Sequence, residues 1–321
     1  MKVKPILIVG GEPNSIFLEI FFKSIKKLNI KHPLILIASV RLVKLQMKKF
    51  KINKKIKVLD LKNLLDKKLD NKSINILDVE YKTNHPFEKI SSKSNIYIAN
   101  CFDIAFKILR SGYTNKFING PINKSTFLNK KFLGVTEYIS QAFKTKKTAM
   151  LIYNKNLSVS PLTTHLPIKL VPRMINQKII KEKVELINSF YLKNIGFKPT
   201  IAVTGLNPHC ESILKFNEDN KIIKPAIESL RKKGYKINGP FPADTLFLKQ
   251  NRNKFDVVLG MYHDQVLTPI KTIKEYDAIN ITLGLPFLRV SPDHGPNKKM
   301  VNKNISNPLS LINSLKFLDL K

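Results

Sequence analysis

Three of the six histidines occupy sequence settings that suit metal chemistry. His165, His209 and His263 each follow an apolar, strand-like run, in a turn that contains or follows proline, glycine or tyrosine. Because ligands of open α/β sheets bind at the carboxyl ends of strands, three such imidazoles can converge. Three imidazoles with one open position are typical of a catalytic zinc site. Their long separations match no compact metal motif, so helix-capping or core histidines are the alternative interpretation.

Two cations and an amide form a second group. Lys271, Asn280 and Arg289 surround a mostly apolar run, residues 279–285, that has no charge of its own. Isolated cations there suit an anionic ligand, and arginine offers a planar fork that can bind it with two hydrogen bonds. Most cations of so basic a chain lie on the surface, but these apolar neighbours favour buried pairing with an anion.

Two aspartates are candidates to orient a ligand histidine or to relay a proton. Asp264 directly follows His263, and Asp244 lies in the sequence PADT. An aspartate in that second setting is equally suited to capping a helix.

Alternating strands and helices, without an internal repeat, must position these residues. Apolar runs predict strands at 6–9, 33–38, 117–120, 148–153, 157–164, 200–206 and 255–260. Helical spacing predicts helices at 15–28, 95–109, 173–192, 221–233 and 308–318. The Lys-rich stretch to about residue 72 is interpreted as peripheral helices and a variable edge. The pattern indicates a largely parallel, helix-covered sheet.

The charge balance first suggests a nucleic-acid or acidic-membrane partner. The 321 residues include 56 Lys+Arg against 23 Asp+Glu, a formal charge of +33. The lysines are spread along the chain, however, and few aromatic residues alternate with them as stacking on single strands requires. We therefore expect no specific nucleic-acid partner, and a basic nucleic-acid-binding protein is kept only as an alternative.

Other features narrow the class further. Two cysteines, Cys101 and Cys210, are too few for a disulfide framework, and no stretch approaches the ~18 uninterrupted apolar residues of a membrane helix. We expect a cytoplasmic protein without a membrane partner. Gly10 and Gly11 are not followed by the Rossmann glycine pattern or a P-loop, so a nucleotide would be held in another way.

Seven motifs in order resemble those of one enzyme family, the 4-hydroxythreonine-4-phosphate dehydrogenases of pyridoxal phosphate synthesis. GPINKS and GVTEY look like the family elements A-P-[IV]-x-K and G-H-T-E-F. The motifs are GPINKS (120–125), GVTEY (134–138), TTHLP (163–167), GLNPH (205–209), GPFPADTLF (239–247), MYHDQ (261–265) and NITLGLPFLRVSPDHG (280–295). The resemblance that they carry extends over most of the chain from residue 119 to residue 295.

The resemblance implies a two-domain α/β fold like the isocitrate and isopropylmalate dehydrogenases, with mostly parallel, helix-covered sheets and the active site in the interdomain cleft. We expect residues 1–119 and 271–321 to form a discontinuous first lobe, and residues 120–270 to form the second. The family also implies a non-Rossmann site for NAD, with NADP left open, and a homodimer with a shared active site.

The resemblance also assigns roles to residues. His165, His209 and His263 would bind a divalent metal, Zn, Co, Mg or Mn, with one histidine supplied by the partner subunit. The remaining assignments concern substrate and catalysis: Thr136, Lys271, Asn280 and Arg289 would hold the substrate, and Asp244, Asp264 and Lys271 are the catalytic candidates.

The implied reaction is the oxidation of 4-phosphohydroxy-L-threonine to a 3-oxo acid that loses CO₂ to give 3-amino-2-oxopropyl phosphate. Three departures from the family pattern bear on the substrate. Val135 replaces a histidine, residues 210–215 lack the family's glycines, and GEPNSIFLE (11–19) replaces G-D-P-x-G-I-G-P-E. A paralogue that oxidises another four-carbon sugar-acid phosphate is therefore the alternative enzyme.

Overall fold

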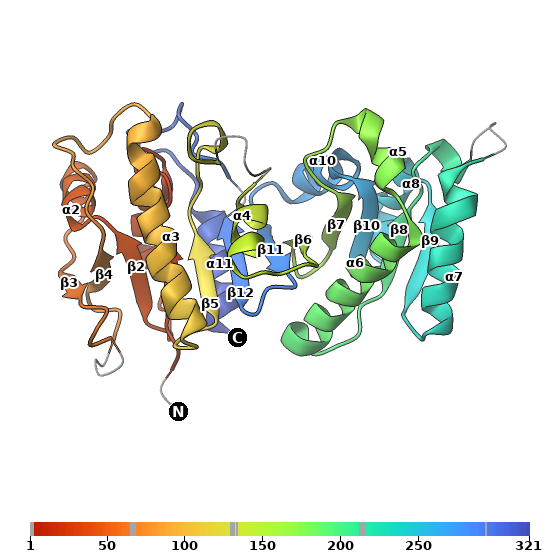
Figure 1. The fold of residues 1–321 in the computed structure, drawn as a ribbon, viewed down its shortest axis with the longest axis horizontal. Coiled ribbons are helices and arrows are strands. Elements are labelled where there is room, and N and C mark those ends of the chain that lie inside the picture. The colour runs from red at the N-terminus through yellow and green to blue at the C-terminus, as the bar shows by residue number, and fades with distance from the viewer. Residues whose placement is uncertain (1–2, 65–68, 129–131, 133, 212–215, 293) are drawn as a thin grey trace. The chain divides into compact units, whose positions relative to one another are not determined.

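The chain folds into two compact units, which are described separately (Figure 1). This computed structural model describes residues 3–64, 69–128, 132, 134–211, 216–292 and 294–321. Unit 1 is Met1–Lys144 with Leu285–Lys321, and unit 2 is Thr145–Gly284.

Both boundaries between the units lie further along the chain than the sequence suggested. The first is later because α4 (Val135–Ala142) packs within unit 1, where Tyr138 meets the ring of Phe102 edge-on at 5.4 Å between centroids. The second is later because β11 (Ile279–Leu283) pairs with a strand of unit 2. Unit 1 is discontinuous and unit 2 is continuous.

Unit 1 contains a parallel sheet with the strand order β3-β4-β2-β1-β5-β12. All four residues of β1 are fully buried, as expected for a parallel strand covered on both faces. The strands are β1 (Ile6–Val9), β2 (Leu34–Ala38), β3 (Ile56–Leu59), β4 (Ile74–Asp78), β5 (Lys116–Asn119) and β12 (Leu288–Pro292).

The strand β3 lies where the sequence predicted only peripheral helices and a variable edge, and β4 begins just beyond that stretch. That interpretation was incomplete, because a helix, Val40–Lys49, and the strand β3 lie in the described part of the stretch. Lysine breaks the apolar run of β3, which hid the strand in the sequence. At the edge of a sheet lysine is tolerated, since it discourages pairing with another chain.

Aromatic packing joins the helices of unit 1 to its sheet. Phe102 on α3 contacts the rings of Phe106, Phe117 and Phe127 at centroid distances of 5.7, 6.3 and 6.2 Å. The helical segments are α1 (Phe17–Lys27), α2 (Val40–Lys49), η1 (Ser92–Ser94), α3 (Asn95–Arg110), η2 (Lys124–Leu128), α4 and α11 (Leu309–Asp319).

A polar cluster fastens the last helix of unit 1 to the sheet. Asp319 accepts hydrogen bonds from the backbone N–H of His32 and pairs with His32 Nδ1, both at 2.9 Å. Lys116 Nζ, at the start of β5, lies 2.5 Å from His32 Nε2. Burial lowers the pKa of Lys116, and the Asp319 charge opposes that shift. The end of α11 is thus bound to both the loop before β2 and the start of β5.

Unit 2 contains a mixed sheet with the strand order β11-β6-β7-β10-β8-β9. β7, β10, β8 and β9 are parallel, whereas β6 is antiparallel to β7 and β11. The strands are β6 (Ala149–Tyr153), β7 (Ser158–Thr163), β8 (Ile201–Thr204), β9 (Ile237–Phe241), β10 (Val257–Tyr262) and β11. The carboxyl ends of β7, β10 and β8 therefore lie side by side.

The predicted single helix at 173–192 is wrong, because two helices replace it. Asn176 ends the first and begins the second by accepting a hydrogen bond from the backbone N–H of Ile179 at 3.0 Å. The helical segments are η3 (Ile168–Leu170), α5 (Val171–Met174), α6 (Gln177–Phe190), η4 (Tyr191–Ile195), η5 (Pro208–Cys210), η6 (Asp219–Ile223), α7 (Lys224–Lys232), α8 (Ala243–Leu246), α9 (Lys249–Arg252) and α10 (His263–Lys274).

The predicted α/β class is confirmed, with largely parallel strands and helices between them. Within the described ranges, every helix is too short or too polar to span a lipid bilayer.

Candidate active site

The three histidines follow three neighbouring parallel strands of unit 2. His165 lies just after β7, His263 just after β10 and His209 in the turn after β8. The rings of His165 and His263 are 6.1 Å apart between centroids and tilted by 35°. Two imidazoles on one tetrahedral zinc ion have centroids about 5 Å apart. These two rings are therefore close to the separation that joint ligation needs.

His165 and His263 line one cavity of about 260 Å³, which Tyr262 and Asp264 also line. His263 Nδ1 lies 2.6 Å from Asp264 Oδ1. With the N–H on Nδ1 donated to the carboxylate, Nε2 carries the lone pair that a metal requires. Asp264 is mostly exposed, so this contact orients the ring but adds little to stability.

Two of the three histidines have left-handed backbone conformations. The φ angles are 23° at His165, 57° at His209 and 61° at Cys210. Outside glycine, each such residue costs about 1 to 2 kcal/mol, so the conformation persists only where its surroundings impose it. Such strain is concentrated at functional sites. The backbone thus marks the same turns that the sequence singled out.

The three histidines are the type of ligand that a divalent ion such as zinc binds, because neutral imidazoles are its usual ligands. One chain, however, does not bring enough of these ligands together. The described part of the chain holds no cluster of three or more His, Cys, Asp or Glu side chains able to bind a metal. His165 and His263 face each other, while His209 is exposed in the neighbouring turn.

Hydrogen bonds fix the strand ends that carry these histidines. Gln265 Oε1 accepts from the backbone N–H of Met261 and from Thr204 Oγ1, and Gln265 Nε2 donates to the Gly205 carbonyl, all at 2.7 Å. Thr163 Oγ1 donates to the Met261 carbonyl at 2.8 Å. The ends of β7, β10 and β8 are thereby joined in one polar network.

In unit 1 the candidate residues Arg289 and Thr136 lie together, and Arg289 is a buried cation. Arg289 is 3% exposed, and its Nε and Nη1 donate to Asn119 Oδ1 at 2.8 Å and Thr136 Oγ1 at 3.1 Å. Burial lowers the pKa of Arg289 to about 10, and the nearby Glu137 charge opposes the shift. The guanidinium stays charged at neutral pH. A positive group thus lies at the start of α4, where the helix dipole also favours an anion.

The other predicted substrate residues lie in unit 2. Asn280, on β11, is half-buried, and its Oδ1 has no hydrogen-bond partner within the described residues. Lys271 is exposed on α10, so within this chain it is not buried as its apolar neighbours in the sequence suggested. The apolar face of that helix, with Val266 and Ile270 among its buried residues, is the face that packs on the sheet.

Asp244 is exposed in the first turn of α8, where its Oδ1 accepts from the backbone N–H of Thr245 at 2.9 Å. The capping position itself is occupied by Pro242. The pKa of Cys210 is raised, first by burial and then by the negative charges of Asp219 and Asp244. Asp244 therefore lies close enough to the His209 turn to act on it electrostatically.

Two of the three departures fall on described residues. Val135 is the half-buried first residue of α4, next to Thr136. Glu12 is buried, and its Oε1 and Oε2 accept from the Asn14 backbone N–H at 3.2 Å and Ser94 Oγ at 3.1 Å. Burial raises the pKa of Glu12. Most of the third departure, residues 212–215, lies outside the described residues.

Sequence reasoning missed three residues that shape these groups. Asn119 and Glu137 contact or face Arg289, and Gln265 joins two strand ends. Each lies within or beside a quoted motif, and that position was the available signal. Except for Met261, which lies four residues before Gln265, their partners are far away in the chain, so no spacing rule identifies them.

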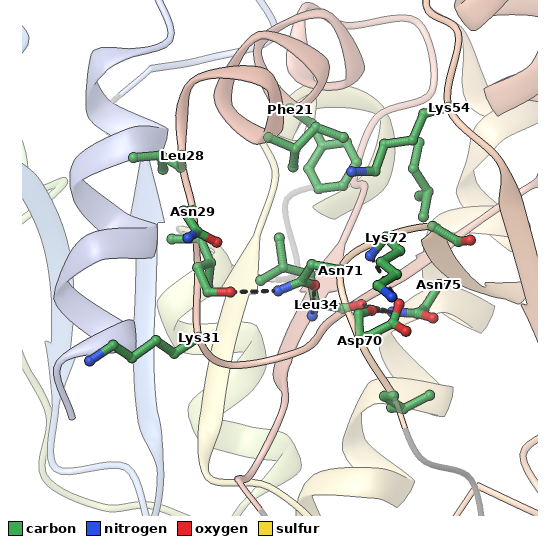
Figure 2. Close-up of a pocket in the computed structure, with 15 residues that line it drawn as sticks. Phe21, Leu28, Asn29, Lys31, Leu34, Lys54, Asp70, Asn71, Lys72 and Asn75 are labelled. Atoms are coloured by element: carbon green, nitrogen blue, oxygen red, sulfur yellow. Dashed lines mark hydrogen bonds between the residues drawn. The ribbon is translucent and has the colours of Figure 1, made fainter.

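A larger cavity, of about 480 Å³, lies in unit 1 beside the segment that leads into β4 (Figure 2). Lys31, Lys54 and Lys72 are three of its fifteen lining residues. The fraction of basic residues in this lining is close to that of the whole chain, in which 56 of 321 residues are Lys or Arg. Its positive charge thus reflects the composition, and it indicates no particular ligand.

Known proteins resemble this chain over most of its length. A family model described as pyridoxal phosphate biosynthetic protein PdxA matches residues 28–318. A 4-hydroxythreonine-4-phosphate dehydrogenase from a Sulfurihydrogenibium species is 35% identical over 314 residues, which are 95% of this chain and 94% of that protein.

Solved structures agree with this likeness. A 4-hydroxythreonine-4-phosphate dehydrogenase from Klebsiella pneumoniae has a TM-score of 0.83 and 26% identity, and the match covers 99% of this chain and 100% of that chain. An isocitrate dehydrogenase from Methylococcus capsulatus has a TM-score of 0.50 at 11% identity, covering 97% and 84% of the two chains. The second likeness concerns the fold alone and agrees with the predicted fold class.

Proposed function

The chain belongs to the PdxA family of pyridoxal phosphate biosynthetic proteins, and on that premise we propose that it oxidises the secondary alcohol of 4-phosphohydroxy-L-threonine with NAD as hydride acceptor. The alcohol C–H passes as hydride to NAD, and the hydroxyl proton passes to a base. The resulting 3-oxo acid then loses CO₂ to give 3-amino-2-oxopropyl phosphate. One observation carries the proposal: the three histidines follow adjacent strand ends, and His165 and His263 face each other across one cavity.

We propose that His165, His209 and His263 hold a divalent metal, with one of the three supplied by the partner subunit of a homodimer. The two-imidazole geometry of one chain supports this arrangement, since it leaves room for a third ligand. When bound, the metal would supply the acidity that the substrate hydroxyl needs. Asp264 orients His263 through the 2.6 Å contact.

The remaining roles concern substrate and protons. Arg289 and Thr136 bind the anionic substrate, which the buried guanidinium and the start of α4 support. Asn280 offers an acceptor with no partner among the described residues. Lys271 and Asp244, both exposed, are the candidates for proton transfer.

The proposal is tested by replacing one candidate ligand. In His209→Ala, bound Zn²⁺ and the rate of NADH formation should fall together, since a ligand is lost. His85→Ala is the matched control, because His85 is exposed in a loop of unit 1 and belongs to none of the quoted motifs. Full zinc occupancy in His209→Ala, measured by elemental analysis, would show that His209 is not a ligand.

A second candidate substrate, another four-carbon sugar-acid phosphate, is favoured by Val135, which cannot hydrogen-bond where the family has histidine. A hydrogen bond to a charged group is worth about 1.5 to 3 kcal/mol, or roughly 10- to 150-fold in binding. Val135→His should therefore raise kcat/KM for 4-phosphohydroxy-L-threonine by roughly one to two orders of magnitude. No gain, together with faster turnover of another hydroxy-acid phosphate by the wild type, would favour the paralogue.

A further inference from the structure

A buried carboxylate supports the turn that carries His209. Asp219 is fully buried at the start of η6. Its Oδ1 accepts from the backbone N–H of Leu206 at 2.7 Å, and its Oδ2 accepts from the backbone N–H and Nδ2 of Asn207 at 3.2 and 2.8 Å. All three donors belong to the two residues that begin the turn.

Gly205 leaves the space that the Asp219 side chain occupies at the start of the turn. A Cβ on Gly205 would lie 2.6 Å from Asp219 Oδ1 and 2.7 Å from Cys210 Sγ. Both distances are shorter than side-chain atoms tolerate, so only glycine lets the carboxylate and the thiol approach the end of β8 together. The close approach of Asp219 thus explains why the first residue of the GLNPH motif, Gly205, is a glycine.

The turn that follows Leu206 and Asn207 is strained. His209 and Cys210 have φ angles of 57° and 61°, in the left-handed region that side chains disfavour. The backbone N–H of Cys210 donates to the carbonyl of Asn207 at 3.1 Å, so the strained residues are bonded to a residue that Asp219 holds in place. If Leu206 and Asn207 were free to move, the turn would relax toward right-handed conformations and His209 would change position.

We infer that Asp219 is a positioning residue, whose carboxylate holds Leu206 and Asn207 so that the strained turn presents His209 for metal ligation. This inference rests on the metal role proposed for His209. It assigns to Asp219 no contact with metal or substrate, because the three hydrogen bonds that its side chain makes with described residues all go to the turn.

A purely structural role would have a different signature. Any aspartate that accepts backbone N–H groups stabilises the fold, and its loss lowers the melting temperature. Asp256 offers a matched comparison, since its Oδ2 accepts from the backbone N–H of Thr200 at 2.7 Å, next to the opposite end of β8. Only Asp219 should affect metal binding.

The experiment measures the Zn²⁺ affinity of the wild type, Asp219→Asn, Asp256→Asn and His209→Ala by competition with a chelating dye. Residues that orient metal ligands typically change affinity by roughly 10- to 100-fold, and we expect a loss of that size in Asp219→Asn. In Asp256→Asn the affinity should stay within about threefold of the wild type although its melting temperature falls. Backbone amide exchange at Leu206 and Asn207 should accelerate in Asp219→Asn alone.

The outcomes separate this inference from the proposed function. If His209→Ala loses zinc but Asp219→Asn binds it like the wild type, the metal role of His209 stands and the positioning role is overturned. If His209→Ala binds zinc as tightly as the wild type, the metal role itself is wrong and the inference falls with it.

A milder variant guards against misfolding of Asp219→Asn. Asn207→Ala removes the Nδ2 hydrogen bond to Asp219 and the longer one, at 3.3 Å, to Glu218 Oε2, and keeps both backbone bonds to Asp219. We expect a smaller loss of Zn²⁺ affinity in the same direction. An unchanged affinity in a folded Asn207→Ala protein would count against the inference.

Discussion

The two candidate regions place their functional side chains by opposite means. In unit 2, His209 is exposed and held in a left-handed turn. In unit 1, Arg289 is 3% exposed and held by the hydrogen bonds that its guanidinium donates to Asn119 and Thr136. A metal ligand must offer a lone pair to the ion, whereas a buried cation needs hydrogen-bond partners within the protein. Substitution of the histidines should therefore impair function without lowering stability, whereas substitution of the arginine should lower both.

The sharpest test of this contrast is His263→Ala, for which we expect the largest effect. Loss of a metal ligand removes several kcal/mol of transition-state stabilisation, so kcat/KM should fall by roughly a thousandfold. Because His263 is half-buried and its side chain pairs with the exposed Asp264, the free energy of unfolding should change by no more than about 0.5 kcal/mol.

Urea unfolding of the metal-free protein and steady-state NADH formation measure the two quantities. A large loss of stability in His263→Ala would break the contrast, because it would show that function and folding are coupled in unit 2 as well.

The second test, Arg289→Lys, should affect stability and substrate affinity together. Lysine keeps the charge but cannot reproduce the planar fork that reaches both Asn119 and Thr136. Hydrogen bonds of a charged group are worth about 1.5 to 3 kcal/mol each, so KM should rise roughly 10- to 100-fold and the melting temperature should fall.

Arg110→Lys is the control for that variant, since Arg110 is exposed and donates to the carbonyl of Ala142 at 2.8 Å. It should leave both quantities nearly unchanged. An unaltered KM in Arg289→Lys would remove Arg289 from the substrate site.

The smallest expected effect concerns Glu12, a buried group of unit 1 that has no compensating cation within hydrogen-bonding distance among the described residues. Burial raises its pKa in the folded state above the ordinary value of 4.5. Its favourable contribution is therefore complete below about pH 4.5 and is lost as pH rises through the raised pKa. Glu12→Gln should match the wild type in acid and become more stable than it above that range.

Urea unfolding at pH 4 and pH 8 checks the sign of this prediction. The amide can still accept from Asn14, and it can donate to Ser94, whose hydroxyl also reaches the Ser91 carbonyl at 3.0 Å. A larger loss of stability in Glu12→Gln at pH 8 than at pH 4 would contradict the prediction, because it would mean that the carboxylate is needed in its charged form.

Sequence patterns predicted features that depend on local periodicity. The strand at 6–9 has the predicted bounds, and the settings of His165, His209 and His263 as strand-end residues are as expected. Each of these features depends on a short run of neighbouring residues. Alternation or a continuous apolar stretch is sufficient to identify them.

Features that depend on contacts between distant residues could not be predicted in this way. The carboxylate of Asp219 reaches Leu206 and Asn207 across a segment with no periodic pattern. The exposure of Lys271 depends on which face of α10 packs against the sheet. Charge and neighbouring apolar residues were a poor guide there, because every amphipathic helix has apolar neighbours beside its exposed cations.

The discontinuity of unit 1 has a consequence for synthesis of the chain on the ribosome. Unit 2 is one continuous segment and can fold as soon as it has emerged, in keeping with the domain-by-domain order of folding during translation. Unit 1 must wait for Leu285–Lys321, which supplies β12, with Arg289, and the helix fastened by Asp319. Until then β5 keeps one unpaired edge, and an unpaired apolar strand edge invites aggregation. Nascent chains stalled just before that last segment should therefore be the species that most needs chaperones.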